Sequence, residues 1–187
     1  MKDRTPRDQV TLEGKVIEGV LDMTAGLHGM QYEVGILASD NLDASPFRKV
    51  DVRGDFTHLP YRDEAFEKVL FDPPHTVDSR NTLLGTIGAA GGLGPHMGAF
   101  KYGCYRSLAD LRKGVFDGAA EAARVLKPGG VLIFKWSNSE KPYSWATDTV
   151  EKAAKGLLEK FRIHTIRSGA HTANFSFYAW YRKRVQN

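Results

Sequence analysis

The sequence predicts an α/β fold in which a mostly parallel, seven-stranded sheet carries helices on both faces. Short apolar runs alternate with loops and helical patterns from residue 16 onward, which is typical of such a sheet. Residues 161–169 and 175–184 form two β-rich runs, close enough in the chain to pair antiparallel at the sheet edge. The 187 residues, 42% of them hydrophobic, suffice for one core, so residues 1–187 are expected to form a single domain.

The other five strands are expected earlier in the chain. Their predicted positions are 16–22, 32–40, 47–56, 68–72 and 131–136. Only "LHGMQ" separates the first two, whereas a connection between parallel strands normally takes a dozen residues or more. The first crossover helix is therefore expected to be short or missing.

Two long helices are expected after residue 106. Ser107 can cap the first, and Asp110 places a negative charge in its first turn. Gly114 and Gly118 lie inside this helix and cost roughly 1 kcal/mol each relative to alanine, which indicates close packing. The second helix is expected over 144–161, since its apolar side chains recur at helical spacing. They are Val150, Ala154, Leu157, Leu158 and Phe161.

Residues 76–104 are rich in glycine and show no periodicity. A loop of this length inside a compact domain is usually a functional lid or disordered, and we interpret it as a substrate lid loop. Its "GAAGGLG" run has neither the Lys-Ser/Thr ending nor the preceding strand of a triphosphate-binding loop, so the sequence argues against that kind of site.

The composition limits the function classes. A formal net charge of +4 favours a polyanionic partner without requiring one. Cys104 is the only cysteine, which excludes an internal disulfide and a thiolate zinc site of the usual spacing. The six histidines are scattered, so no metal site is expected. No run has the apolar length of a membrane helix, and no apolar run follows the charged first ten residues. We therefore expect a cytoplasmic protein without a membrane anchor.

Acids stand at the ends of four predicted strands. They are Asp22, Asp40, Asp55 and Asp72. In open α/β sheets, ligands bind beyond the carboxyl ends of the strands. After Asp22, the small residues Ala25 and Gly26 would let a ligand approach the backbone. Asp40 follows Asp22 at a spacing close to that of an acid that binds ribose hydroxyls. A nucleotide-like cofactor is one interpretation, and ordinary glycine turns of an α/β protein are the alternative.

Three stretches carry a resemblance to a known family. "VLDMTAG" (20–26), "GDFTHLPYRDEAFEKVLFDPPH" (54–75) and "RVLKPGGVLIFKW" (124–136) look like the successive motifs of class I S-adenosylmethionine-dependent methyltransferases. "DPPH" resembles the Asp-Pro-Pro-aromatic signature of enzymes that methylate amines of adenine or cytosine. With "KYG" and the short first connection, the chain looks closest to small stand-alone methyltransferases of bacteria and phages. The resemblance covers most of residues 16–137 and implies a Rossmann-like sheet.

The resemblance also implies a cofactor, S-adenosyl-L-methionine, and a place for it. Its methionine part would lie by residues 22–26, namely Asp22, Thr24, Ala25 and Gly26. Its ribose would bind Asp40, its adenine would lie near Asp55 and Phe56, and Asp72 would face the methyl group. For Asp55 the cap of a turn, and for Phe56 a place in the core, are the alternatives.

The corner "DPPH" suits methyl transfer to an amine. Pro73 and Pro74 keep the chain extended and stiff and offer no N–H, so the Asp72 carboxylate and nearby carbonyls face the crevice as acceptors. An exocyclic amine can donate to them, which turns its lone pair toward the methyl group. The resemblance gives Asp72, Pro73 and Pro74 this catalytic role.

His75 stands where the signature has a larger aromatic ring. Its flat imidazole can stack on an extruded base, for which aromatic side chains contribute about 1–3 kcal/mol. A general base and a solvated loop residue are the alternatives. Further substrate contacts are expected from the lid loop, through Lys101 and Tyr102, and from Lys135 and a half-buried Trp136.

The resemblance implies an S-adenosylmethionine-dependent N-methyltransferase, with N6 of adenine in DNA as the preferred substrate and DNA favoured over RNA as the partner. A methyltransferase for RNA or a small molecule, and a non-catalytic cofactor-binding module, remain open. A nicotinamide-dependent oxidoreductase would need a Gly-x-Gly-x-x-Gly turn, which "DMTAGLHG" does not supply. No target-recognition domain is visible, so sequence specificity would come from the lid loop, the termini or a partner.

Overall fold

The computed structural model describes residues 16–25, 29–44, 50–77, 105–137, 141–167 and 175–185. These residues form a seven-stranded sheet with the order β3-β2-β1-β4-β5-β7-β6. The strands are β1 (Val16–Asp22), β2 (Leu37–Asp43), β3 (Val52–Arg53), β4 (Phe66–Phe71), β5 (Leu126–Ser137), β6 (Leu158–Arg167) and β7 (Phe175–Lys183). The first five are parallel, and β7 is antiparallel to β5 and β6. The predicted sheet, with its antiparallel pair at the edge, is confirmed.

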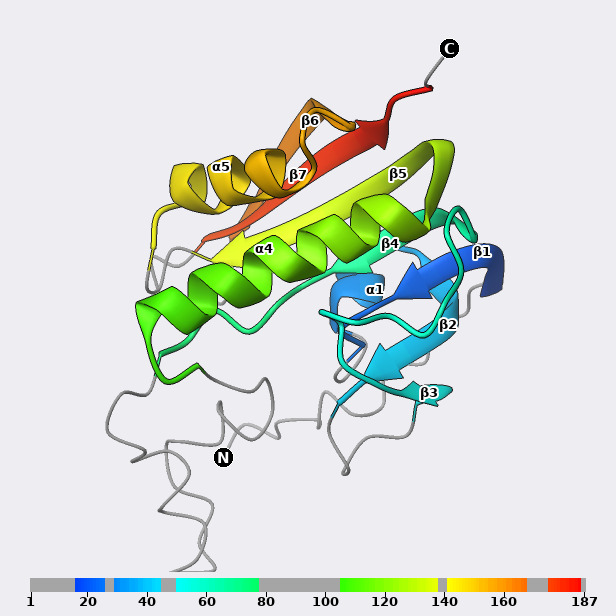
Figure 1. Cartoon of the computed structure of the whole chain (residues 1–187), viewed down its shortest axis with the longest axis horizontal. Coiled ribbons are helices and arrows are strands. Elements are labelled where there is room, and N and C mark those ends of the chain that lie inside the picture. The colour runs from blue at the N-terminus through cyan, green and yellow to red at the C-terminus, as the bar shows by residue number, and fades with distance from the viewer. Residues whose placement is uncertain are drawn as a thin grey trace, which may run out of the picture.

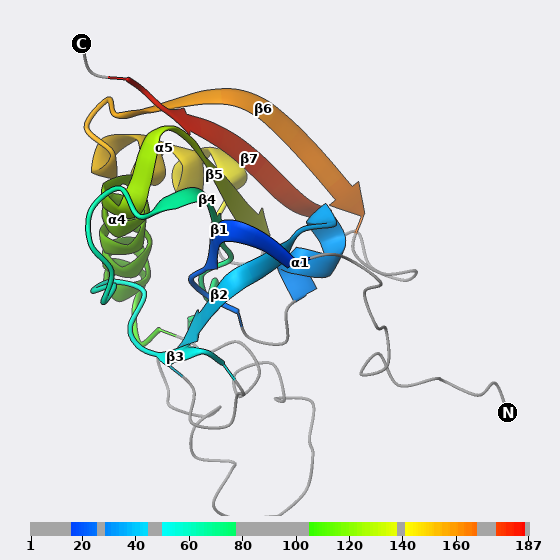
Figure 2. The ribbon, with the colours of Figure 1, turned by 90° about the vertical axis from the view of Figure 1, so that its right-hand side faces the viewer.

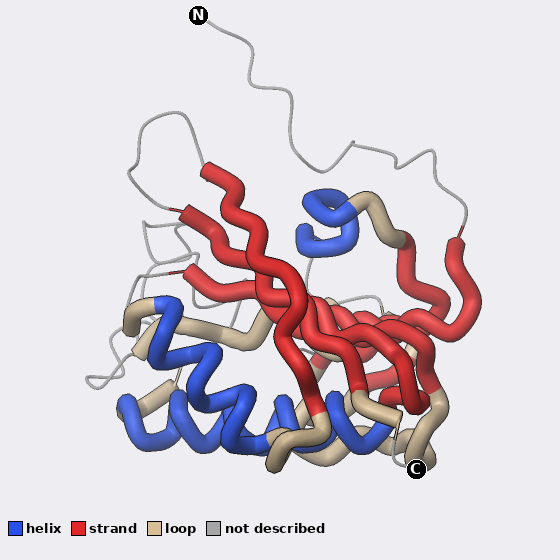
Figure 3. The backbone as a smooth tube through the Cα atoms, turned by 90° about the horizontal axis from the view of Figure 1, so that it is seen from above, coloured by secondary structure: helices blue, strands red, loops and turns tan. Residues whose placement is uncertain are grey.

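Helices lie on both faces of the sheet, as expected (Figures 1 and 2). The helices α4 (Leu108–Val125) and α5 (Tyr143–Ala153) cover one face, where they bury Leu21, Val69 and Phe134. The short helix α1 (Gly29–Val34) lies on the other face, as the view from above also shows (Figure 3). Its six residues confirm that the first crossover helix is short.

The long helix α4 begins where the sequence predicts. Its N-cap Ser107 accepts a hydrogen bond from the backbone N of Asp110 (3.1 Å), which satisfies one of the unpaired donors of the first turn. The two glycines of the helix lie in tight contacts, as their cost in helix stability suggested. A Cβ on Gly118 would come within 2.5 Å of the Phe71 ring, and one on Gly114 within 2.3 Å of the Tyr105 hydroxyl. Both positions require glycine because the neighbouring rings leave no room.

Several expected boundaries are wrong. The second strand begins at Leu37 rather than 32, because residues 29–34 form α1, and the fifth begins at Leu126 rather than 131. The second strand ends at Asp43 rather than near Asp40, because β2 continues beyond the residue that pairs with Asp22. The third strand is only Val52–Arg53, since it pairs with just the last two residues of β2. The second long helix ends at Ala153 rather than 161, because Lys155 and Gly156 have φ angles of 48° and 81°, which reverse the chain. Leu158 and Phe161 therefore belong to β6.

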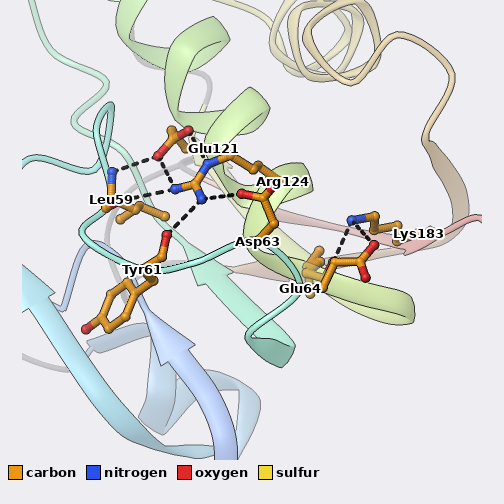
Figure 4. A network of polar contacts seen from close by, with 8 residues as sticks. Leu59, Tyr61, Asp63, Glu64, Glu121, Arg124 and Lys183 are labelled. Carbon is orange, nitrogen blue, oxygen red and sulfur yellow. Dashed lines mark hydrogen bonds and ion pairs between the residues drawn. The ribbon is translucent and has the colours of Figure 1, made fainter.

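Arg124 fastens the segment before β4 to helix α4 (Figure 4). Its guanidinium has five N–H donors, and all five are used. They reach the carboxylates of Glu121 and Asp63 and the carbonyl oxygens of Leu59 and Tyr61, at 2.7–3.1 Å. Glu121 in turn accepts a hydrogen bond from the backbone N of Leu59 (2.7 Å). An open hollow lies beside this network, at the amino ends of the parallel strands, and is lined by Glu64, Leu157 and Lys183 among others.

Replacing Arg124 by lysine is expected to lower the free energy of unfolding by about 2–3 kcal/mol, because an ammonium has only three N–H donors and cannot reach all five acceptor atoms. Urea denaturation followed by circular dichroism measures the loss. The control is Arg112→Lys, an exposed arginine on the same helix, which should change stability by less than about 0.5 kcal/mol. Equal stability of the two variants would contradict the role assigned to Arg124.

Within the described part of the chain, no helix has the length and apolar character needed to cross a membrane.

Candidate functional site

Three of the predicted site residues, Asp22, Asp72 and Lys135, lie at the ends of β1, β4 and β5, beside the end of β2. Asp22 is the last residue of β1, Asp43 ends β2, Asp72 follows β4 directly, and Lys135 lies near the end of β5. Because these four strands are parallel, their carboxyl ends lie along one edge of the sheet. This edge is opposite the hollow beside Arg124, so the hollow is not the candidate site.

Asp72 is held in place through its backbone and through one carboxylate oxygen. Its backbone N donates a hydrogen bond to the hydroxyl oxygen of Thr24 (2.8 Å), which ties the corner after β4 to the turn after β1. Its Oδ2 lies 3.0 Å from Nζ of Lys135, in an ion pair whose two side chains are 17% and 14% exposed. The other oxygen, Oδ1, accepts no hydrogen bond from any residue that the structure describes. Among the described residues, one acceptor of this corner therefore has no donor.

Lys135 is held by two acids. Besides Asp72, it pairs with Oε2 of Glu33 from helix α1 (2.8 Å), and the hydroxyl of Tyr178 on β7 donates to the same Glu33 oxygen. Burial alone would lower the pKa of Lys135, but the charges and hydrogen bonds of Asp72 and Glu33 raise it above its usual value. Burial and the contact with Glu33 likewise raise the pKa of Tyr178. Lys135 is therefore a fixed cation and Tyr178 a neutral donor at ordinary pH.

Glu33 and Tyr178 were not predicted from the sequence. Glu33 lies in a short helix that pattern analysis did not resolve, and Tyr178 is one of several aromatic residues in an edge strand. Only the pairing of β7 with β5, which sets Tyr178 opposite Lys135, brings them to the site. A buried tyrosine usually needs a partner for its hydroxyl, and this was the one available signal.

Asp22 is buried and holds the turn after β1 together. Its carboxylate accepts hydrogen bonds from Nε2 of Gln31 (2.8 Å) and from the backbone N of Thr24 (3.2 Å), and it is 1% exposed. Burial raises its pKa from 3.8 to about 7, an effect that the hydrogen bonds reduce and the nearby charges of Asp72 and Asp43 increase. Gln31, which sequence reasoning missed, also donates to the Asn41 side chain (2.7 Å).

The end of β2 carries more acids than expected. Asp40 lies within the strand, where its Oδ2 accepts a hydrogen bond from the Ser39 hydroxyl (2.9 Å). Asp43 is the last residue of β2, and the preceding carbonyl, that of Leu42, accepts a hydrogen bond from the backbone N of Ala25 (3.0 Å). Beside them, Asp51 accepts two hydrogen bonds from Asn41. Asp43 therefore stands at the sheet edge, next to the turn after β1, where Asp40 was expected.

Asp55 and Phe56 follow β3 closely in the chain. Asp55 is exposed and its Oδ1 accepts a hydrogen bond from the backbone N of Thr57 (2.8 Å), which stabilises a turn. Phe56 packs on Phe71 with 5.5 Å between ring centroids, close to Gly118 of helix α4. Neither contact involves the acids at the ends of β1 and β2.

His75 lies against the wall of the site. Its ring meets that of Trp136 edge-on, with 6.0 Å between centroids. Trp136 is fully buried rather than half-buried, because Phe134 and Trp145 pack on its ring and its Nε1 donates to the Lys141 carbonyl (2.8 Å). Trp136 thus supports His75 and has no surface open to a substrate.

The ends of the predicted lid loop lie side by side next to this corner. Val77 and Tyr105 form a parallel bridge, and the backbone N of Tyr105 donates to the Thr76 carbonyl (2.9 Å). The loop itself, with Lys101 and Tyr102, lies outside the described residues, as does Gly26. Among the residues described, no group of three or more His, Cys, Asp and Glu side chains could hold a metal ion.

No family model and no curated protein sequence matches the chain. Solved structures do match. The [4+2]-cyclase SpnF has a TM-score of 0.55 at 14% identity, over 94% of this chain and 77% of its own. The 1,6-didemethyltoxoflavin-N1-methyltransferase of Burkholderia thailandensis, solved with S-adenosylhomocysteine, has a TM-score of 0.53 at 11% identity, and the match covers 89% of this chain and 71% of that enzyme. A methyltransferase of Thermotoga maritima described as a possible histamine N-methyltransferase has 0.52 at 14% identity, over 89% and 81%.

These identities are low, so the likeness shows the fold alone. The chain has the fold of S-adenosylmethionine-dependent methyltransferases. Since one of the matching structures is a cyclase, the chemistry has to be argued from the site.

Proposed function

We propose that the protein is an S-adenosylmethionine-dependent N-methyltransferase that acts on an exocyclic amine, that of adenine in DNA. The observation that carries this proposal is the corner after β4. There Oδ1 of Asp72 has no donor among the described residues, and Asp72 is followed by two prolines that have no N–H. The fold supports the proposal.

The residues at the sheet edge suit this cofactor. Asp43 and Asp40 offer carboxylate oxygens near the end of β2, which ribose hydroxyls need as acceptors. Ala25 is small and buried, so the turn after β1 presents backbone rather than a bulky side chain. The charges of Asp43 and Asp72 both reach Asp22 and raise its pKa, so this edge of the sheet carries negative charge, which favours a bound cation. When bound, S-adenosyl-L-methionine supplies a methyl group carried on a positively charged sulfur.

Asp72 would orient the amine. Its Oδ1 can accept a hydrogen bond from one N–H, while the rigid prolines keep the carboxylate and the neighbouring carbonyls in place. An amine held in this way directs its lone pair to one side, so the barrier to transfer falls through positioning. His75 would place the base by stacking on it, and its edge contact with Trp136 would help to hold the imidazole in place.

The choice of adenine in DNA is supported by the likeness of Asp72–His75 to the signature of base-methylating enzymes and by the positive net charge. The test is to incubate the purified protein with S-adenosylmethionine labelled in its methyl group and with DNA, RNA or a mixture of small amines, followed by mass spectrometry of the nucleosides. Label in N6-methyladenine from DNA is expected. Label only in RNA or in small amines would reject the substrate, and no transfer by a protein that binds the cofactor would reject the enzyme.

A further inference from the structure

Lys135 and Asp72 place a hydrogen-bond donor beside an acceptor. The ammonium of Lys135 has three N–H donors, and its ion pairs with Asp72 (3.0 Å) and Glu33 (2.8 Å) use two. The third N–H of Lys135 has no acceptor among the described residues. Likewise, none of the described residues donates a hydrogen bond to Oδ1 of Asp72. The site can therefore offer one acceptor and one donor side by side.

Such a pair matches one kind of amine. In adenine the exocyclic N6 donates, and the adjacent ring nitrogen N1 accepts; cytosine offers N4 and N3 in the same way. Enzymes that act on an extruded base read this edge with hydrogen bonds. An alkylamine, or an amine on a ring carbon without a neighbouring nitrogen, has nothing to accept the second hydrogen bond.

We propose that Lys135 determines substrate specificity by donating its third N–H to the ring nitrogen next to the amine that Asp72 binds. The proposal rests on the proposed function and narrows it to amines that lie beside a ring nitrogen. Glu33 acts as a positioning residue, because it holds the ammonium through a second ion pair. Tyr178 in turn fixes Glu33 by donating to its carboxylate.

The burial of Lys135 supports a role beyond surface charge. A lysine side chain loses rotamer entropy when it is fixed, and the two acids have already fixed this one before substrate arrives. A group held in this way forms its hydrogen bond at little further cost. A lysine that only held Asp72 in place would favour every substrate equally. A lysine that contacts the ring nitrogen would favour only substrates that have this nitrogen, and an experiment can detect that difference.

The experiment compares two single-stranded DNA pools of random sequence, one made with adenine and the other with 1-deazaadenine, in which a C–H replaces N1 beside the same amine. For the wild type, kcat/KM should be about 10- to 100-fold lower on 1-deazaadenine, since a hydrogen bond from a charged donor is lost. Lys135→Met should lower kcat/KM on adenine by a similar factor and bring the ratio between the two pools close to one. The two amines can differ in intrinsic reactivity, but that difference affects the wild type and the variant equally. Comparing the ratio of the wild type with that of the variant therefore removes it.

Two controls keep the result interpretable. Lys127→Met changes an exposed lysine at the start of β5 and should leave the ratio at its wild-type value. Glu33→Gln keeps the size of the side chain and should give an intermediate ratio, which provides a second test should Lys135→Met fail to fold. Binding of S-adenosylhomocysteine, measured by calorimetry, reports whether each variant is intact.

Two outcomes separate this inference from the proposed function. If the wild type methylates adenine and 1-deazaadenine equally well, or if Lys135→Met keeps the wild-type ratio, the role of Lys135 is wrong while the methyltransferase stands. If the wild type binds S-adenosylhomocysteine but methylates neither pool, the proposed DNA substrate is wrong, and the inference is rejected with it.

Discussion

Replacing Asp72 by alanine is expected to lower methyl transfer by about 10²- to 10³-fold while S-adenosylhomocysteine binding changes only a few-fold. The change removes the acceptor that orients the amine, and interactions of this kind account for a large part of the rate in such sites. Asp72→Asn keeps a carbonyl oxygen and the shape of the side chain, so its activity should lie between those of Asp72→Ala and the wild type. Single-turnover kinetics with labelled cofactor measures the chemical step.

The control for Asp72 is Asp148→Ala, an exposed acid on helix α5, which should keep wild-type activity. Because alanine also leaves the buried Lys135 with only one acid, unfolding by urea must be measured for each variant. Asp72→Ala with wild-type turnover would remove the main support for the proposed function.

The second large effect is on stability and comes from Asp22. Burial disfavours the carboxylate and raises the pKa of Asp22 from the ordinary 3.8 to about 7 in the folded protein. Between these pH values Asp22 loses its proton in the unfolded chain but keeps it in the folded protein. The contribution of Asp22 to the free energy of unfolding is therefore greatest below about pH 4 and falls as the pH rises toward 7. The loss amounts to as much as about 4 kcal/mol over that range.

Asp22→Asn is expected to remove this pH dependence, because an amide does not titrate. Urea denaturation of the variant and the wild type at pH 5, 6, 7 and 8 gives the difference in unfolding free energy, which should shift in favour of the variant as the pH rises and level off above pH 7. Asp148→Asn, at an exposed position, should show no such trend. A constant difference between Asp22→Asn and the wild type would contradict the burial of a protonated Asp22.

The fold could be predicted where a local pattern determines it. The apolar run that ends at Asp72 stops at two prolines, and Ser107 caps α4, so β4 and this helix begin or end close to the expected positions. The extended helix prediction failed because Leu157 and Leu158 fit a helical stripe as well as a strand. The turn at Lys155 and Gly156, with positive φ angles, decided between them.

The site could be predicted only in part, for a related reason. Asp72 and Lys135 lie at the ends of β4 and β5, which are paired parallel strands, so an α/β sheet brings them to the same edge. The partners of Lys135 depend instead on where α1 packs and on the register of β7. The spacing of apolar residues in the sequence shows neither the packing of α1 nor the register of β7, so Glu33 and Tyr178 were missed.

The central claim is that the corner after β4 holds an open carboxylate oxygen against the reactive end of the cofactor. A crystal structure with sinefungin tests it most directly, because this analogue of S-adenosylmethionine carries an amine in place of the transferable methyl group, on a carbon that replaces the sulfur. The account predicts that this amine lies about 3 Å from Oδ1 of Asp72, with the ribose at the end of β2 beside Asp43. Sinefungin bound away from this edge, for example in the hollow beside Arg124, would contradict it.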